Sequence, residues 1–539
     1  MPNHDEEDAT FELAGLRTLD RRKLILGAGG SAAALAFMVN HPTRASARVS
    51  AVPADEDPFT LGVASGDPLP NGVVLWTRLA PRPFEAYGGL SPDRAVEVKW
   101  QVSTDENFST VVRQGTELAH PEYSFSVHVD ATGLEPDTVY HYRFATGGHL
   151  SPTGRTRTAP APGADLSELK FAFASCNSFG AGWFTSADHL ADEDVDLIFF
   201  LGDYIYEYPL VAEQSLRENA PEMPSVLSTS TGSLSRYRLQ YAAYRLEPEL
   251  QRAHQNAPWI VTWDDHEVEN DVWGFPDDAD HVDEMVQRAN AYRAYWEHMP
   301  LRRRQMPKGP DARLYRRFDF GQLARFSMLD VRQFRTEPLS GSSIVDSPER
   351  RDPTRSMLGR QQEAWFLDGL RSSPTQWNVA AQGVLMSLLD TDPGEERAFS
   401  NGGWDAYQAS QQRVMDTVTQ HEVDNFVVLT GDIHRNYALS MLADFDDLES
   451  PRVGSEFAVT SMTSGGDGTD SNAGLEDRLR SNPHLAWGSL QRGYARGRLT
   501  PDRLEIDYRE VRYVQRKGAP VDTSRSFVVE AGRPGLEDA

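Results

Sequence analysis

Short apolar runs that alternate with helix-like segments constrain the fold of this 539-residue chain most strongly. Each run has the length of a buried strand, and the segments between the runs carry apolar residues at helical spacing. The strand-like runs are 169–175, 195–201, 259–263, 324–329, 377–382 and 425–430. The helix-like segments are 183–193, 237–254, 283–298, 361–370 and 408–421. This alternation predicts a layered α/β domain from about residue 168 onward.

Side chains suited to metal binding follow four of these runs. They are Cys176 after the first run, Asp203 and Tyr206 after the second, Asp264, Asp265 and His266 after the third, and Asp432 and His434 after the last. In open α/β sheets, ligands bind beyond the carboxyl ends of strands, so these ends are expected to meet at one site. Carboxylate, imidazole, thiolate and phenolate donors together suit a ferric ion beside a harder divalent ion.

Each motif alone has a plainer interpretation. A Gly-Asp pair after a strand is more often a turn with a capping carboxylate, and residues 264–267 could begin a helix. His266 could be a core histidine whose hydrogen bonds are satisfied. Cys176, the only cysteine of the chain, could be buried as a small apolar residue. The coincidence of four motifs at strand ends in one domain favours a shared site.

The first part of the chain has the pattern of a small all-β domain. Between residues 59 and 158, turn residues separate short alternating runs, and residues 133–144 have the form of a corner turn that leads into a strand with a tyrosine. We expect a β-sandwich domain of the immunoglobulin or fibronectin type over residues 57–158, followed by a Pro- and Ala-rich linker at 159–163. The α/β domain then spans 168–530, and residues 531–539 form a C-terminal tail.

The first 47 residues have the pattern of a twin-arginine signal peptide. Arg21 and Arg22 precede an uncharged stretch that runs to Val39, and 45–47 is a small-residue cleavage site. A short membrane anchor is the alternative, but the stretch falls short of the roughly 20 strongly apolar residues that span a bilayer. We therefore expect export through the twin-arginine machinery, and a secreted or cell-wall-associated protein with no membrane-spanning segment after cleavage.

The formal net charge of −27 limits the partners of the chain. It argues against nucleic acid, because phosphate backbones are bound by clustered Lys and Arg. The same surface charge repels anionic substrates. A substrate that carries phosphate therefore needs local positive charge, from metal ions or from arginines.

Six segments of the chain together resemble the PhoD-type alkaline phosphatases. They are LGDYIYEY at 201–208, TWDDHEVEN at 262–270, LTGDIH at 429–434, ASC at 174–176, FTLGVASGDP at 59–68 and TSGG at 463–466. The resemblance implies a metallophosphoesterase-like four-layer α/β/β/α sandwich behind the N-terminal all-β domain. It also implies a metal site similar to that of purple acid phosphatases.

The resemblance further implies a role for each matching residue. The implied Fe³⁺ ligands are Cys176, Asp203, Tyr206 and His434. Asp203 bridges to Ca²⁺, and Asp265, Asp432 and Asn270 fall where the family has its calcium ligands. Arg238 and His266 fall where the family contacts the substrate phosphate. His266 could act there as an acid catalyst or as a phosphate binder. A surface ion pair is the alternative for Arg238.

These assignments predict an exported alkaline phosphatase that hydrolyses phosphate mono- and diesters for phosphate acquisition. A metal-activated water attacks the phosphorus in line, and no phosphoenzyme forms. One alternative is a secreted phosphodiesterase similar to phospholipase D, with phospholipids among its substrates. The alternative from a different class is an exported protein that binds calcium or phosphate without catalysis.

Overall fold

The computed structural model describes residues 52, 55–275, 279–341, 343–394 and 396–539. The twin-arginine signal predicted for residues 1–47 lies outside these residues. The described residues belong to one compact unit. Within them, no helix is both long and apolar enough to cross a membrane.

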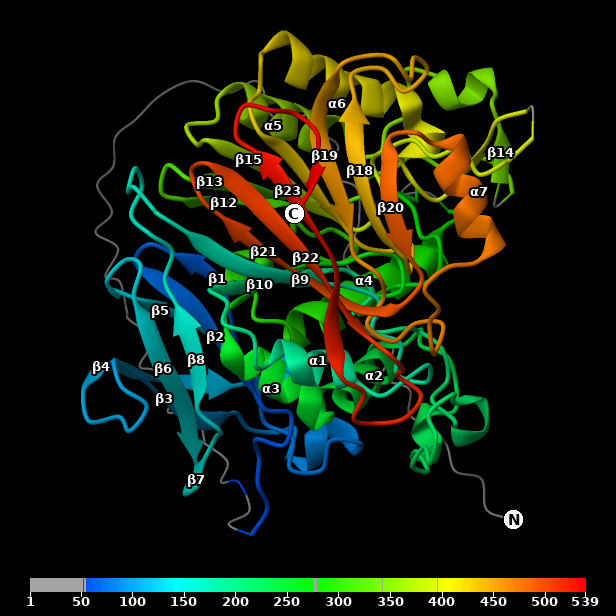
Figure 1. Cartoon of the computed structure of the whole chain (residues 1–539). Helices are drawn as coiled ribbons and strands as arrows, with labels where there is room; N and C mark the ends of the chain where they lie inside the picture. The colour runs from blue at the N-terminus through cyan, green and yellow to red at the C-terminus, as the bar shows by residue number, and fades with distance from the viewer. Residues whose placement is uncertain (1–51, 53–54, 276–278, 342, 395) are drawn as a thin grey trace, which may run out of the picture. The chain divides into compact units, whose positions relative to one another are not determined.

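A ten-stranded sheet forms the first half of the core (Figure 1). At its centre, β9 (Leu169–Ala174), β10 (Leu197–Leu201) and β11 (Trp259–Thr262) run parallel. One side is extended by the antiparallel strands β21 (Arg492–Leu499), β22 (Arg503–Val511), β23 (Val521–Glu530) and β24 (Glu537–Asp538). The other side is extended by β1 (Val63–Leu69), β2 (Gly72–Arg78) and β5 (Ser126–Thr132). The three central strands therefore end at the same edge of the sheet.

A seven-stranded sheet packs face to face against the first. Its order is β12 (Arg316–Phe320), β13 (Ala324–Met328), β15 (Trp377–Gln382), β17 (Phe426–Thr430), β19 (Arg452–Ala458), β18 (Asn436–Leu442) and β20 (Leu485–Ser489). One buried apolar cluster takes side chains from both sheets. In it, the rings of Phe199 on β10 and Phe326 on β13 lie 4.7 Å apart. A separate small sheet pairs β14 (Ser343–Val345) with β16 (Ala398–Ser400).

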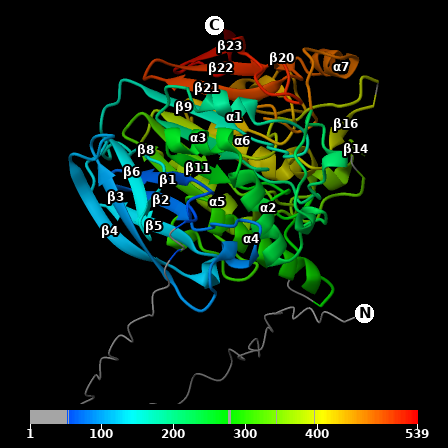
Figure 2. The same ribbon diagram turned by 90° about the horizontal axis from the view of Figure 1, so that it is seen from below.

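Helices pack on both large sheets (Figures 1 and 2). Against the ten-stranded sheet lie α1 (Thr185–Leu190), α2 (Leu234–Arg245), α3 (Pro248–Asn256) and α4 (Val282–His298). Against the seven-stranded sheet lie α5 (Gly359–Arg371) and α6 (Gln408–Gln420), while α7 (Ala473–Ser481) packs on β20. The six predicted strands and four of the five predicted helices are present, and their ends differ from the prediction by at most three residues.

The fifth predicted helix, over 237–254, was wrong as a single element. The structure has two helices there, because Glu247 adopts an extended backbone and Pro248 begins α3. Proline lacks the amide hydrogen that the interior of a helix requires, but it fits the first turn.

The N-terminal β segment is continuous with the main sheet. One five-stranded sheet belongs to this segment alone. Its strands are β4 (Val111–Ala119), β3 (Val96–Ser103), β6 (Val139–Thr146), β7 (His149–Leu150) and β8 (Gly154–Arg157). It shares a buried apolar core with β1, β2 and β5. However, β1 also pairs in parallel with β11, so that Gly66 lies opposite Trp259. This differs from the expectation of a separate domain, because one half of the sandwich is an extension of the central sheet.

Two neighbouring residues explain how β1 is joined to the core. A Cβ atom on Gly66 would lie 2.6 Å from the carbonyl oxygen of Trp259, so only glycine permits this approach. The buried carboxylate of Asp67 accepts from the guanidinium of Arg316 on β12, with 2.7 Å between Nη2 and Oδ1. Arg316 also donates to the carbonyl of Val261 at 3.0 Å. The Gly-Asp pair of β1 thus binds strands of both large sheets.

We predict that Gly66→Ala destabilises the protein by about 1–3 kcal/mol, because the added methyl group overpacks the β1–β11 junction. The loss is measured as a fall of Tm. Gly232→Ala is the matched control, since a Cβ atom there meets nothing within 4 Å. Equal Tm values for the two variants would contradict the proposed strand junction.

Candidate metal centre

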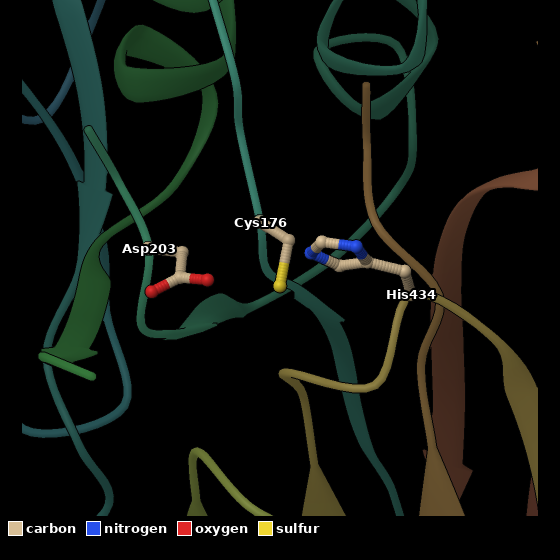
Figure 3. Close-up of side chains that lie close together, drawn as sticks. All are labelled: Cys176, Asp203 and His434. Atoms are coloured by element: carbon tan, nitrogen blue, oxygen red, sulfur yellow. The ribbon is translucent and has the colours of Figure 1, made fainter. Parts of the chain in front are cut away.

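Cys176, Asp203 and His434 come from three different strand ends and converge (Figure 3). One potential ligand atom from each lies within 4.8 Å of those of the other two. Backbone hydrogen bonds hold the first two loops together, since Cys176 N donates to Gly202 O at 3.1 Å and Asn177 N donates to Asp203 O at 2.8 Å. The expectation that separate strand ends meet is therefore met for these three residues.

The backbone at this edge is held in an unusual conformation. Cys176, Asp203, Asp432 and His434 have φ angles of 60°, 57°, 62° and 52°. A residue other than glycine in the left-handed region costs on the order of 1 kcal/mol or more, and such residues gather at functional sites. Gly202 sits between two of these strand ends, where a Cβ atom would lie 2.5 Å from that of Asp264. The strained backbone lowers local stability, and it brings these side chains together.

Tyr206 completes the first group of donors. Its hydroxyl donates to Asp203 Oδ2 at 3.0 Å and lies 3.0 Å from His434 Nε2. Ser464 Oγ donates to the same hydroxyl at 2.7 Å. Burial, and next the charge of Asp203, raises the pKa of both Tyr206 and the Cys176 thiol well above the usual values. A cation of high charge would favour the thiolate and the phenolate, so this donor set fits a metal ion.

Asp265 belongs to two further groups that could hold a cation. One combines it with Asp203 and His266, and the other with Asp264 and Asp432. Asp265 Oδ2 accepts from the amide of Asp271 at 2.7 Å. Its Oδ1 is buried and has no hydrogen-bond partner among the residues that the structure describes. An orphaned carboxylate oxygen is costly unless a cation binds it, so Asp265 also fits a metal ligand.

Glu267 ties the loops after β10 and β11 together. Its fully buried carboxylate accepts from the backbone amides of Asp203 at 3.1 Å, Tyr204 at 2.5 Å and Asp264 at 2.8 Å. Sequence reasoning did not single out this residue. Its position two residues after Asp265 could have marked it as part of the site. The acidic run 264–267 was, however, equally well interpreted as the start of a helix.

His266 is held by a carboxylate that sequence reasoning also missed. Its Nδ1 lies 2.7 Å from Glu207 Oε2, and its ring lies 4.1 Å from that of Tyr206. Burial lowers the pKa of His266, but Asp203 and the hydrogen bond to Glu207 outweigh burial and raise it to about 10. Glu207 thus favours the protonated imidazole and sets its orientation.

Asn270 lies next to the centre without a clear contact to it. Its backbone amide donates to Glu207 Oε1 at 3.0 Å. Its side chain is exposed, and Nδ2 donates to Asp271 Oδ2 at 2.9 Å. The described contacts connect Asn270 to the loop around Asp265 rather than to the other predicted ligands.

Arg238, which the resemblance assigns to the substrate phosphate, forms an ion pair in the structure. On α2, its guanidinium is bound by the fully buried carboxylate of Glu297 on α4, with 2.6 Å between Nε and Oε2. A second nitrogen of the same group donates to Glu297 Oε1 at 2.7 Å and to the carbonyl of Glu122 at 3.0 Å. The ion pair considered as the alternative is present, and it is largely buried rather than on the surface.

Arg332 supplies the positive charge that sequence reasoning missed. It is buried, and it binds Asp264 through two parallel hydrogen bonds of 2.5 and 2.8 Å. Arg332 lies three residues after the predicted strand 324–329. The expectation that ligands bind beyond the carboxyl ends of strands could therefore have identified it. Its neighbours Asp330 and Val331 gave no motif to mark it.

The mixed α/β architecture thus presents, at one edge of its sheets, a set of donors that suits a metal ion. The family model described as PhoD-like phosphatase matches residues 171–508. The model for the N-terminal domain of PhoD-like phosphatases matches residues 44–160.

Two known proteins show the same relationship. Alkaline phosphatase D of Bacillus subtilis (strain 168) is 44% identical over 523 residues, which cover 96% of this chain and 89% of that protein. A solved structure described as the structure of PhoD is 44% identical, with a TM-score of 0.86 and coverage of 91% of this chain and 93% of that one. The chain therefore belongs to the PhoD-like phosphatase family, which confirms the resemblance drawn from its motifs and the prediction of a phosphatase.

We predict that Arg238→Ala lowers stability but leaves kcat/KM for a phosphate ester unchanged. The substitution removes charged hydrogen bonds from the buried Glu297, which lowers the free energy of unfolding by about 1.5–3 kcal/mol. The loss is no larger because Arg293 remains bound to Glu297. Arg252→Ala serves as control, since Arg252 forms exposed ion pairs that contribute little. A large fall of kcat/KM without loss of Tm would instead support the assignment of Arg238 to the substrate phosphate.

Proposed function

We propose that this protein is an exported phosphatase that hydrolyses phosphate mono- and diesters with Fe³⁺ and Ca²⁺, for phosphate acquisition. The observation that carries the proposal is the convergence of Cys176, Asp203, Tyr206 and His434 beside the orphaned oxygen of Asp265. A thiol, a phenol and an imidazole around one carboxylate are typical of iron rather than of calcium or magnesium. The layering of helices and sheets supports a metallophosphoesterase-like four-layer α/β/β/α sandwich.

The residues divide between two kinds of ion. Cys176, Tyr206 and His434 would hold Fe³⁺, and Asp203 would bridge to Ca²⁺. Asp265 and Asp432, with Asn270 as a further candidate, would hold Ca²⁺, which prefers oxygen ligands. When bound, these ions supply the charge that stabilises the phosphoryl oxygens and that makes water a nucleophile.

His266 is the residue of this chain best suited to contact the phosphate. When it is protonated, the imidazole oriented by Glu207 can donate a charge-assisted hydrogen bond to a phosphoryl oxygen or a proton to the leaving oxygen. The ring of the half-exposed Tyr208 lies 5.5 Å from the imidazole. This side chain gives the leaving group an aromatic contact. Positive charge at this point also offsets the repulsion of an anionic substrate by a chain of net charge −27.

Export through the twin-arginine pathway suits this function, because that route carries proteins already folded with their metal ions. The substrates would then be phosphate esters outside the cell. Phospholipids would be among these substrates if the diester activity dominates. A phosphodiesterase similar to phospholipase D and a binding protein without catalysis are the outcomes that the experiments below separate.

Cys176→Ala is expected to lose iron, any charge-transfer colour and phosphatase activity together. The thiol is buried and has no disulfide partner, so its removal should leave the fold intact. Metal content by elemental analysis, the visible spectrum and kcat are measured on the same preparation. Full iron content with full activity would show that the cysteine only fills space.

The substrate class is tested by comparing rates on a monoester, a bis-ester and phosphatidylcholine. We expect the metal-loaded protein to hydrolyse the monoester and the bis-ester, and chelation to abolish both activities. Activity on the phosphatidylcholine head group alone favours the enzyme similar to phospholipase D. A protein that carries its metals but hydrolyses none of the three contradicts the proposed activity. Zinc alone in the native protein would contradict the ligand assignment.

A further inference from the structure

The guanidinium of Arg332 lies among four carboxylates, of which the exposed Asp271 is the most distant, with 3.8 Å between Nη1 and Oδ1. Nη2 of Arg332 is 2.8 Å from Asp264 Oδ2, 3.1 Å from Asp432 Oδ1 and 3.5 Å from Asp265 Oδ2. Its Nε donates to the other oxygen of Asp264 at 2.5 Å. The side chain is only 2% exposed, so water contributes little to its solvation.

The three nearer carboxylates have the geometry of a cation site. One oxygen from each of Asp264, Asp265 and Asp432 lies within 4.8 Å of the other two. Asp264 and Asp265 are buried, so water does little to screen the repulsion between them. Three carboxylates at this distance require a positive charge, and the guanidinium of Arg332 supplies one in contact with all three.

We propose that Arg332 is a built-in cation that takes the place of a metal ion among Asp264, Asp265 and Asp432. Its permanent charge and two-pronged geometry match a carboxylate, and both oxygens of Asp264 are used by it. Oδ2 of Asp265 faces Arg332, whereas Oδ1 has no hydrogen-bond partner in the described part of the chain. Only Oδ1 of the partly exposed Asp432 contacts Arg332. The Ca²⁺ proposed for Asp265 and Asp432 would therefore lie outside the space that the guanidinium fills, on the side of Asp203. This inference rests on the proposed function in that the groups built on Asp203 bind metal.

The test counts the divalent ions bound by each variant. Purified full-length protein is stripped with a chelator, reloaded with Ca²⁺ alone and analysed by equilibrium dialysis and elemental analysis. Arg332→Ala opens the space and is expected to bind one Ca²⁺ per chain more than the wild-type protein. Arg332→Lys keeps a cation in the cluster and is expected to bind the wild-type number. The double variant Arg332→Ala/Asp264→Asn is expected to lose the additional ion.

Arg335→Ala is the matched control. Arg335 is fully buried three residues further along, and it donates to the backbone carbonyls of Asp271, Val272 and Gly402. Its removal loosens the same loop without freeing a carboxylate pair, so the wild-type number of ions is expected. Should Arg332→Ala fail to fold, Arg332→Gln removes the charge with less loss of volume, and one additional Ca²⁺ is expected again.

An unchanged count in a folded Arg332→Ala or Arg332→Gln protein overturns the proposal. So does a gain of one ion in Arg335→Ala, which would make the gain a result of a loosened loop. The readout is a difference between variant and wild type, whereas the identity of the metals in the wild-type protein tests the proposed function. The two can therefore fail separately.

Discussion

Buried negative charge at one edge of the sheets is the constraint on which the rest of the structure depends. Five acidic side chains of the centre are almost completely buried, namely Asp203, Glu207, Asp264, Asp265 and Glu267. A buried carboxylate without compensation costs several kcal/mol. The protein compensates in different ways, with backbone amides for Glu267, an imidazole for Glu207 and a guanidinium for Asp264. Asp203 accepts only from a hydroxyl and a backbone amide, and Asp265 Oδ1 has no partner among the described residues. These two carboxylates are therefore the best placed to bind a metal ion.

Both large sheets contribute to this charge. Cys176, Asp203 and Asp265 follow strands of the ten-stranded sheet, whereas Asp432 and His434 follow β17 of the seven-stranded sheet. The distances between the two sets of donors therefore depend on how closely the sheets pack, which is set by the apolar cluster between them. The N-terminal hairpin enters the same arrangement, because β1 extends the sheet next to β11. Packing far from the donors thus determines their geometry.

The strands and the converging strand ends could be predicted because both signals are local in the sequence. Apolar runs of strand length are followed directly by their polar residues, as at Asp203 and Asp265. Pairings between distant segments could not be predicted in this way. Arg238 was assigned by its motif context, but its partner Glu297 lies 59 residues away and nothing near Arg238 indicates it. The join of β1 to β11 depends on a close approach of Gly66 to Trp259, which no periodicity reveals.

Arg238 and Arg332 show why the type of residue alone does not assign a role. Both guanidinium groups bind a buried carboxylate through two nitrogens. Glu297 is bound by both Arg238 and Arg293, so its charge is fully compensated and the contact serves the packing of helices. Arg332 instead faces Asp264, Asp265 and Asp432, so the cluster around it retains an excess of negative charge. A fixed cation can satisfy Asp264 at all times, whereas the excess that remains on Asp265 and Asp432 is what attracts exchangeable ions to the neighbouring groups.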